Sequence, residues 1–257
     1  MNRLVTYCLR VSLFALLGIA NISSSARAQN GNWQVSIGTG VSYAPRYDGD
    51  AENQLRVVPL LDINYNKDKF FIGVTRGIGF NFSEVKYFQY GVRVLLGQAR
   101  SQDADVRLYG MGNIDYYPEG SLFFSTHLGF ISLSSSVASS DYGTHADIGS
   151  NIAIPLGEED RFRLGATINW GDSVYNQTYF GVTAAQATAS GNILTAYNAA
   201  EGKKDTSLSA SWVHHFDKSW FCNLGVSYKR LEGSAQLSPL TQRTSMVGES
   251  LMLGYRF

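Results

Sequence analysis

Hydrophobic and polar positions alternate with a period of two along most of this chain. The pattern is clearest at the carboxyl end, where the odd positions of 251–257 are Leu, Leu, Tyr and Phe, while Gly254 and Arg256 occupy the other side. Such alternation predicts β-strands that each have one apolar face. Eleven segments show it: 33–43, 55–66, 69–82, 87–97, 106–117, 122–133, 144–154, 162–171, 207–216, 220–231 and 245–257.

Segment length separates the two ways in which an all-β chain of this kind can fold. Strands of about ten residues suit a transmembrane antiparallel up-and-down β-barrel, whereas a soluble β-sandwich has shorter strands and leaves the aromatic carboxyl terminus unexplained. Within 69–82, Phe70, Ile72 and Phe80 share one face and Gly79 and Asn81 share the other. One apolar face toward lipid and one small or polar face toward a narrow lumen predict the barrel.

Strand number and loop placement follow from the rules for single-chain bacterial barrels. These barrels have an even number of strands, so we predict twelve, with ten as the alternative, and place the missing strand in the first half or after Gly171. The short turns 216–219 and 118–121 are predicted on the periplasmic side. The long polar stretches 172–205 and 232–244 are predicted as extracellular loops, the first of them as a candidate plug, and the Ser-rich 132–140 is predicted as a loop.

The amino terminus has the features of an export signal. Arg3 and Arg10 precede the apolar run 11–20, and Ala26-Arg27-Ala28 offers a cleavage site between small residues. That run is shorter than the roughly 20 apolar residues that a membrane-spanning helix needs. We therefore predict a cleaved signal peptide over 1–28 and a single barrel domain over 29–257.

Composition and charge agree with a barrel and exclude some partners. The chain has 15 Tyr, 14 Phe and 26 Gly, yet its mean hydropathy is slightly negative, which fits a wall where every second residue meets lipid. Removing the leader takes away three basic residues and leaves a small acidic excess, which gives no reason to expect nucleic acid as a partner. Cys222 is then the only cysteine and is expected to be a small strand side chain.

Residues that could support catalysis or bind a metal give no recognisable constellation. Adjacent residues of a strand point to opposite faces, so His214 and His215 cannot act on one substrate, and a catalytic role for His127 would need a serine and an acid from elsewhere in the wall. The acidic groups at 48–52 and 103–105 lack the spacing of a calcium-binding loop and are expected to be solvated. We predict no catalytic residue, no metal site and no cofactor.

Several stretches resemble the MipA/OmpV family of outer-membrane proteins, named for an MltA-interacting protein, over almost the whole mature chain. The residues that carry the resemblance, and that we take as candidate functional loop positions, are Pro45, Tyr47, Gly49, Tyr179, Phe180, Gly181, Val182, Ser190, Gly191, Ser238 and Pro239. Tyr255 and Phe257 resemble the terminal signal by which bacterial outer-membrane proteins are recognised for assembly.

The resemblance implies a location, a set of partners and a function. It implies a barrel in the lipid of a Gram-negative outer membrane that serves as a scaffold between a murein transglycosylase and a peptidoglycan synthase. Relatives also resemble porin-like channels and adhesins, so a narrow channel for small solutes and a surface adhesin remain alternatives. A hydrolase is the weakest reading, because no nucleophile motif supports it.

Overall fold

A computed structural model describes residues 32–85 and 87–257. The predicted signal peptide, 1–28, lies outside the described residues. Among the described residues, no helix has the length and apolar character that a membrane-spanning helix requires.

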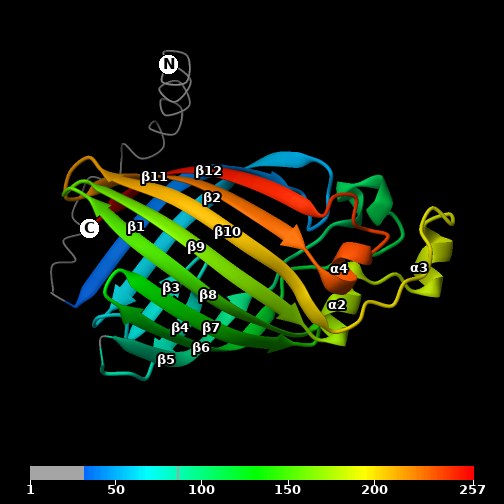
Figure 1. The fold of residues 1–257 in the computed structure, drawn as a ribbon, viewed down its shortest axis with the longest axis horizontal. Coiled ribbons are helices and arrows are strands. Elements are labelled where there is room, and N and C mark those ends of the chain that lie inside the picture. Colours follow the sequence, from blue (N-terminus) through cyan, green and yellow to red (C-terminus); the bar gives the residue numbers. More distant parts are fainter. Residues whose placement is uncertain (1–31, 86) are drawn as a thin grey trace, which may run out of the picture.

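Twelve antiparallel strands form one closed barrel in which each strand pairs with its neighbours in sequence and β1 pairs with β12 (Figure 1). This confirms the predicted fold and strand number. The strands are β1 (Trp33–Pro45), β2 (Asn53–Tyr65), β3 (Phe70–Gly73), β4 (Gly77–Asn81), β5 (Phe88–Leu96), β6 (Pro118–Leu128), β7 (Ile131–Ser140), β8 (Gly143–Leu156), β9 (Asp160–Gly171), β10 (Gly202–His215), β11 (Trp220–Leu231) and β12 (Ser245–Arg256).

The closure between the first and last strands follows the alternation read from the sequence. Ile37 lies opposite Tyr255 and Thr39 opposite Leu253, while Gly38 lies opposite the buried Gly254 on the lumenal face. A side chain on Gly38 would meet the backbone of β12, so these two strands approach closely because both carry glycine there. Closure leaves no free edge between β1 and β12, as a hydrocarbon environment requires.

Two predicted segments differ from the structure in the first half of the chain. The segment 69–82 is not one strand but the short hairpin β3–β4, which reverses at 74–76, with the next residue, Gly77, at a φ of 77°. The predicted strand 106–117 is wrong, because this stretch belongs to the connection 97–117, which contains 3-10 helices at Gln102–Ala104 and Val106–Leu108. The faces assigned to the hairpin are correct, since a reversal after an odd number of residues preserves the alternation.

The Ser-rich stretch 132–140 is strand β7 and not the predicted loop. Ser132, Ser134 and Ser136 face the lumen, while Leu133 and Val137 face outward, so the period of two is present but its inner face is mostly serine. The turn before it lies at Gly129, with a φ of 65°, inside the predicted strand 122–133. The predicted turn 118–121 is also wrong, because these residues begin β6.

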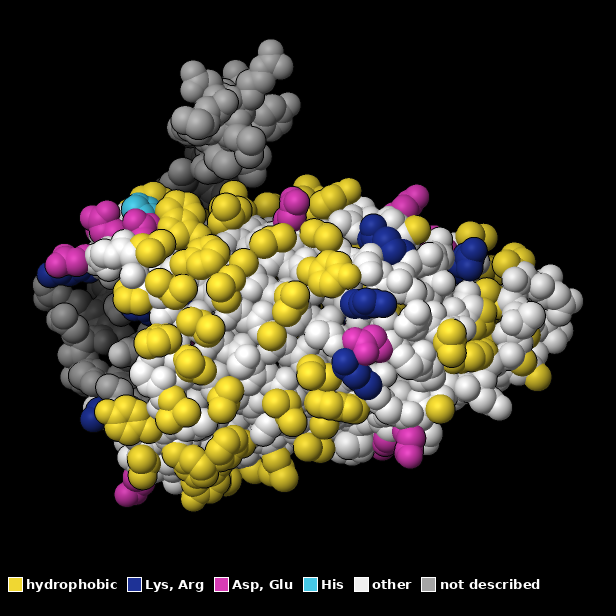
Figure 2. Space-filling view, viewed as in Figure 1, with side chains coloured by type: hydrophobic (Ala, Val, Ile, Leu, Met, Phe, Trp, Pro, Cys, Tyr) yellow, Lys and Arg dark blue, Asp and Glu magenta, His cyan; other side chains and the backbone are white. Residues whose placement is uncertain are grey.

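The outer wall carries the apolar side chains that lipid would contact. Leu122, Leu208 and Leu224 are at least half exposed, from three different strands. Figure 2 shows hydrophobic side chains spread over the wall, with charged side chains at the rim near the chain ends and again toward the opposite end. Aromatic side chains near the first rim form contacts such as Trp220 with Tyr255 and Tyr255 with Phe257, as in the aromatic girdle of an outer-membrane barrel.

The two ends of the barrel differ in the length of their connections. Trp33, where β1 begins, and Phe257 lie at one end together with the short turns, such as 66–69 and 216–219, and we call this the terminal end (Figure 1). The opposite end, which we call the loop end, carries the long connections. These contain the helices α2 (Ser173–Phe180), α3 (Ala184–Ala189) and α4 (Gly233–Leu237).

Candidate functional site

Four connections at the loop end pack into one structure, which we call the cap: 46–52, 97–117, 172–201 and 232–244. Their contacts form two apolar clusters, although each connection alone reads as polar. The first cluster contains Tyr47, Leu108, Met111, Val182, Leu194 and Leu240. The second contains Phe180, Ala199, Leu231, Ala235 and Met246, and joins the cap to the ends of β11 and β12. The cap therefore has a small hydrophobic core of its own.

The segment at 179–183 is the junction between two helices. Asp172 accepts a hydrogen bond from the backbone of Tyr175 at 2.7 Å and begins α2, and Gly181 ends it. Thr183 and Gln186 then form a reciprocal capping box that begins α3. The run Tyr179 to Val182 is thus placed at a chain reversal in the middle of the cap.

Hydrogen bonds to main-chain carbonyls fix this junction against the other connections. The hydroxyl of Ser238 donates to the carbonyl of Phe180 at 2.6 Å, and the guanidinium of Arg100 donates to the carbonyl of Tyr179 at 2.7 Å. From the last connection, Gln242 donates to the Tyr47 hydroxyl at 2.8 Å. All four connections meet at these bonds and at the apolar contacts beside them.

Two acidic groups of the first connection, Asp48 and Asp50, are not solvated, contrary to the prediction, whereas Glu52 is exposed as predicted. Asp50 has no exposed surface, and Arg46 contacts it at 2.5 Å and Asp105 of the second connection at 2.7 Å. Burial alone would raise the pKa of Asp50, but the hydrogen bond and charge of Arg46 outweigh it and hold the pKa below its ordinary value. The carboxylates hold two connections together through one arginine.

A second charged group lies where the cap meets the lumen. Asp48 contacts the Lys229 ammonium at 2.8 Å and the Lys204 ammonium at 3.8 Å, and Lys204 also lies 3.4 Å from Asp205. Burial would raise the pKa of Asp48, but the two lysine charges lower it below its ordinary value. The Lys204 ammonium lies 5.4 Å from the centre of the Tyr175 ring, within reach of a cation–π contact from α2.

Tyrosines of α2 complete the contact across the barrel mouth. The Tyr179 hydroxyl donates to the carbonyl of Gln98 at 2.7 Å and lies 2.8 Å from the Tyr117 hydroxyl, and burial raises the pKa of Tyr179 to about 12. The Tyr175 ring lies 4.8 Å from that of Tyr179 and 4.8 Å from that of His145 on β8. Side chains of α2 thus contact β8, β10 and Tyr117, the residue before β6. A segment that plugs the loop end of the barrel would make contacts of this kind.

The cap brings together the candidate positions from three separate parts of the sequence. Tyr47, Phe180, Val182, Ser190 and Ser238 are buried in it. The remaining positions set the backbone: Pro45 ends β1, Gly49 and Gly191 have φ of 97° and 69°, Gly181 ends α2, and the Pro239 carbonyl accepts a hydrogen bond from Arg107. Tyr255 and Phe257 lie at the terminal end, away from the cap.

Sequence reasoning missed the charged residues that hold the cap to the wall. Lys204 and Lys229 come from β10 and β11, and Asp48 comes from the first connection, so no spacing in the sequence relates them. One signal was available. Lys229 occupies a lumen-facing position within the alternation of β11, and a lysine charge removed from bulk water needs a nearby anion.

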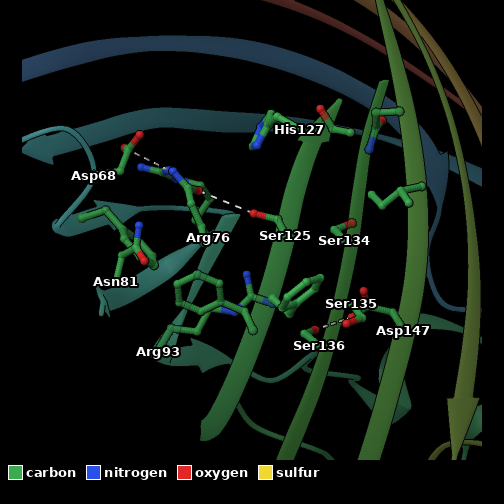
Figure 3. Close-up of a pocket in the computed structure, with 17 residues that line it drawn as sticks. Asp68, Arg76, Asn81, Arg93, Ser125, His127, Ser134, Ser135, Ser136 and Asp147 are labelled. Carbon is green, nitrogen blue, oxygen red and sulfur yellow. Dashed lines mark hydrogen bonds and ion pairs between the residues drawn. The ribbon is translucent and has the colours of Figure 1, made fainter. Parts of the chain in front are cut away.

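A separate pocket of about 370 Å³ lies in the lumen (Figure 3). Asp68 in the turn at 66–69 and Ser132 at the start of β7 place it in the half nearer the terminal end. Its charged and aromatic lining residues are Asp68, Phe71, Arg76, Arg93, Phe123, Phe124, His127 and Asp147. Arg76 folds back from the β3–β4 reversal and contacts Asp62 at 3.3 Å and Asp68 at 3.5 Å. The short hairpin thereby directs a guanidinium into the lumen.

The histidines lie as the strand alternation predicts. His214 contacts Asp160 at 2.9 Å on the outer face, whereas His215 stacks on Phe221 with ring centres 5.9 Å apart on the other face. In the part of the chain that the structure describes, the His127 ring makes no hydrogen bond to a serine or an acid. No group of three or more His, Cys, Asp or Glu side chains there is arranged to hold a metal ion.

The fold and the cap define a class: a membrane-type twelve-stranded β-barrel whose loop end is filled by its own connections. The model of the family described as MltA-interacting protein MipA matches residues 37–257, and the chain belongs to this family. None of the curated proteins matches the chain.

Solved structures that resemble the chain are outer-membrane porins and transporters of low sequence identity. A NanC porin is 6% identical, with 86% of this chain and 98% of that chain covered and a TM-score of 0.46. An anion-selective porin from Comamonas acidovorans is 10% identical, with 88% and 98% covered and a TM-score of 0.41. The toluene transporter TodX of Pseudomonas putida is 8% identical, with 88% and 89% covered and a TM-score of 0.41.

Proposed function

We propose that this protein is a non-enzymatic scaffold in the outer membrane of a Gram-negative bacterium, which holds a murein transglycosylase and a peptidoglycan synthase on its periplasmic side. One observation carries the proposal. The long connections at the loop end pack into a cap with its own hydrophobic core and charged contacts to the wall, and this favours a closed body over an open passage. The description of the family as MltA-interacting supports the transglycosylase as a partner.

The surface available to such partners is the rim of short turns at the terminal end. Single-chain barrels have their short turns on the periplasmic side, which supports a periplasmic position for this rim. Lys67, Glu158 and Lys218 are exposed on three of its turns. Exposed charges of both signs steer association and fix orientation more than they add affinity, as suits a protein that positions enzymes.

Asp217, beside Lys218, has a structural role that affects the choice of variants. Its carboxylate accepts hydrogen bonds from the backbone of Ser219 and of Trp220, each at 2.7 Å, and these bonds lower the pKa of Asp217 below its ordinary value. Replacing Asp217 would disturb the turn itself. Lys218 is therefore the better position for testing partner capture.

The test is capture of a purified murein transglycosylase, and then of a synthase, by the refolded barrel in lipid vesicles. The charge reversals Lys218→Glu and Glu158→Lys should each weaken capture about three- to tenfold, whereas Glu201→Lys, an exposed reversal at the loop end, should not. All variants must show heat-dependent gel migration as the sign of a folded barrel. If no charge reversal at the terminal end changes capture, the rim of short turns is not the surface that binds the partners.

A narrow channel is the second candidate, and the lumenal pocket favours it. Polar side chains line the pocket, and polar side chains such as Ser209 and Ser227 face the lumen elsewhere in the wall. Single-channel recordings distinguish the two proposals. Discrete conductance steps from the unaltered protein would favour the channel, whereas a folded but electrically silent barrel would favour the scaffold.

A further inference from the structure

The lumenal pocket contains one cation and one anion that face the same space without pairing. Arg93 on β5 donates through Nε to the Ser121 hydroxyl at 3.3 Å, and its guanidinium lies 5.6 Å from the centre of the Phe123 ring. Asp147 on β8 accepts a hydrogen bond from the hydroxyl of Ser136. Figure 3 shows both side chains reaching into the pocket from different strands.

Neither charge is in a direct ion pair with the protein, in contrast to the neighbouring arginine, although the charge of Asp147 acts on Arg93 from a distance. Over 32–85 and 87–257, neither Arg93 nor Asp147 belongs to any ion pair, whereas Arg76 in the same pocket contacts both Asp62 and Asp68. A charge that faces a confined space binds an opposite charge more strongly than it would in open water, because solvent screens it less. Arg93 and Asp147 therefore keep most of their hydrogen-bonding capacity for an occupant.

We propose that this pocket binds a small zwitterion of the amino acid or dipeptide class, with its carboxylate on Arg93 and its ammonium on Asp147. Guanidinium–carboxylate and ammonium–carboxylate contacts are the stronger, charge-assisted kind of hydrogen bond. A simple anion or cation would satisfy only one of the two protein charges, and a neutral sugar would satisfy neither. The zwitterion is the ligand class whose charges match both.

The size and the remaining lining fit such a ligand. A volume of about 370 Å³ lies at the lower end of the range of about 300–1,000 Å³ that is typical of small-molecule sites. Asn81, Gln89, Ser134 and Asn151 supply neutral donors and acceptors around the two charges. The pocket lies in the half of the lumen away from the cap, so we infer entry of the ligand from the terminal end. This binding does not depend on the scaffold function.

The test compares three probes on the refolded full-length mature barrel by isothermal titration calorimetry. Alanylalanine carries both charges, N-acetyl-alanylalanine keeps only the carboxylate, and alanylalanine amide keeps only the ammonium. We expect millimolar binding of alanylalanine and binding of each blocked probe that is weaker by about tenfold or more, because each has lost one charged hydrogen-bonding group.

Variants then assign each end of the ligand. Arg93→Gln should remove the advantage of the free carboxylate, so that alanylalanine binds no better than its amide, and Asp147→Asn should do the same for the ammonium. Arg163→Gln is the matched control, because Arg163 faces the lumen on β9 but does not line the pocket, and it should leave binding unchanged.

Two results would overturn the proposal. One is equal affinity for the three probes. The other is the absence of alanylalanine binding below roughly 50 mM, a level weaker than a millimolar dissociation constant. If a variant does not fold, as judged by heat-dependent gel migration, the comparison of the three probes on the unaltered protein still decides the matter.

Discussion

Phe180→Ala should release the cap while leaving the barrel intact. The Phe180 side chain is 1% exposed and packs in a cluster with Leu231, Ala235 and Met246, so it joins α2 to α4 and to the ends of two strands. Truncating a buried phenylalanine to alanine costs about 3–5 kcal/mol, through lost transfer free energy and the cavity left behind. Since about 1.4 kcal/mol changes an equilibrium constant tenfold, the ratio of closed to open cap should fall by at least roughly two orders of magnitude.

Limited proteolysis of the folded protein measures this ratio. When opening and closing are fast relative to cleavage, the cleavage rate follows the population of the open form, so cleavage within 172–201 should accelerate by a similar factor. Phe130→Ala is the matched control, because Phe130 is 65% exposed in the turn between β6 and β7 at the terminal end. If the two variants are cleaved at the same rate, Phe180 does not hold the cap. If the barrel itself unfolds, the cap is not a separate unit.

Three further perturbations test other parts of the structure. Asp48→Asn should lower the free energy of unfolding by about 1–3 kcal/mol, because it leaves Lys229 without its anion. Adding Lys229→Met should recover part of this loss in urea unfolding. If the effects of the two substitutions are strictly additive, Asp48 and Lys229 do not interact. Burial raises the pKa of Tyr47 and of Tyr179 to about 12 from an ordinary 10, so the stability that they contribute is complete below pH 10 and is lost as pH rises through 12. Ultraviolet titration should detect their ionisation near pH 12, and proteolytic cleavage of the cap should accelerate over the same pH range. Ionisation near pH 10 would refute the burial argument. Phe257→Ser should lower the fraction of barrel assembled in cells but not refolding in vitro, as followed by gel migration; equal assembly would exclude a terminal signal.

The strands were predictable wherever one face is apolar, because apolar side chains toward lipid then alternate along the sequence with small or polar side chains toward the lumen. The errors fall where that alternation does not show which strands pair or where the chain turns. The inner face of β7 is a row of serines that resembles a low-complexity loop, and the reversal at 74–76 lies within a run whose alternation continues through it. In both cases the decisive factor was pairing with a neighbouring strand, and pairing is not a property of the segment alone.

The candidate loop positions were found through a resemblance, and their proximity was not predictable from spacing. Tyr47, Phe180 and Ser238 are separated by long stretches of chain, and they meet because the closed barrel places its long connections at one end. Arg93 and Asp147 meet in the lumen for the same reason, from strands that are not adjacent in the sheet. Arg93 and Asp147 carry no local pattern that distinguishes them from other polar residues of the wall.

That this chain forms a β-barrel could be predicted from the residues alone, because the period of two is a local property, and strands with one apolar face form a closed sheet in a membrane. The cap at the loop end and the pocket in the lumen could be found only in the folded protein. The cap and the pocket are built from side chains of distant segments, and the free energy of such contacts depends on three-dimensional proximity, which the order of residues along the chain does not specify.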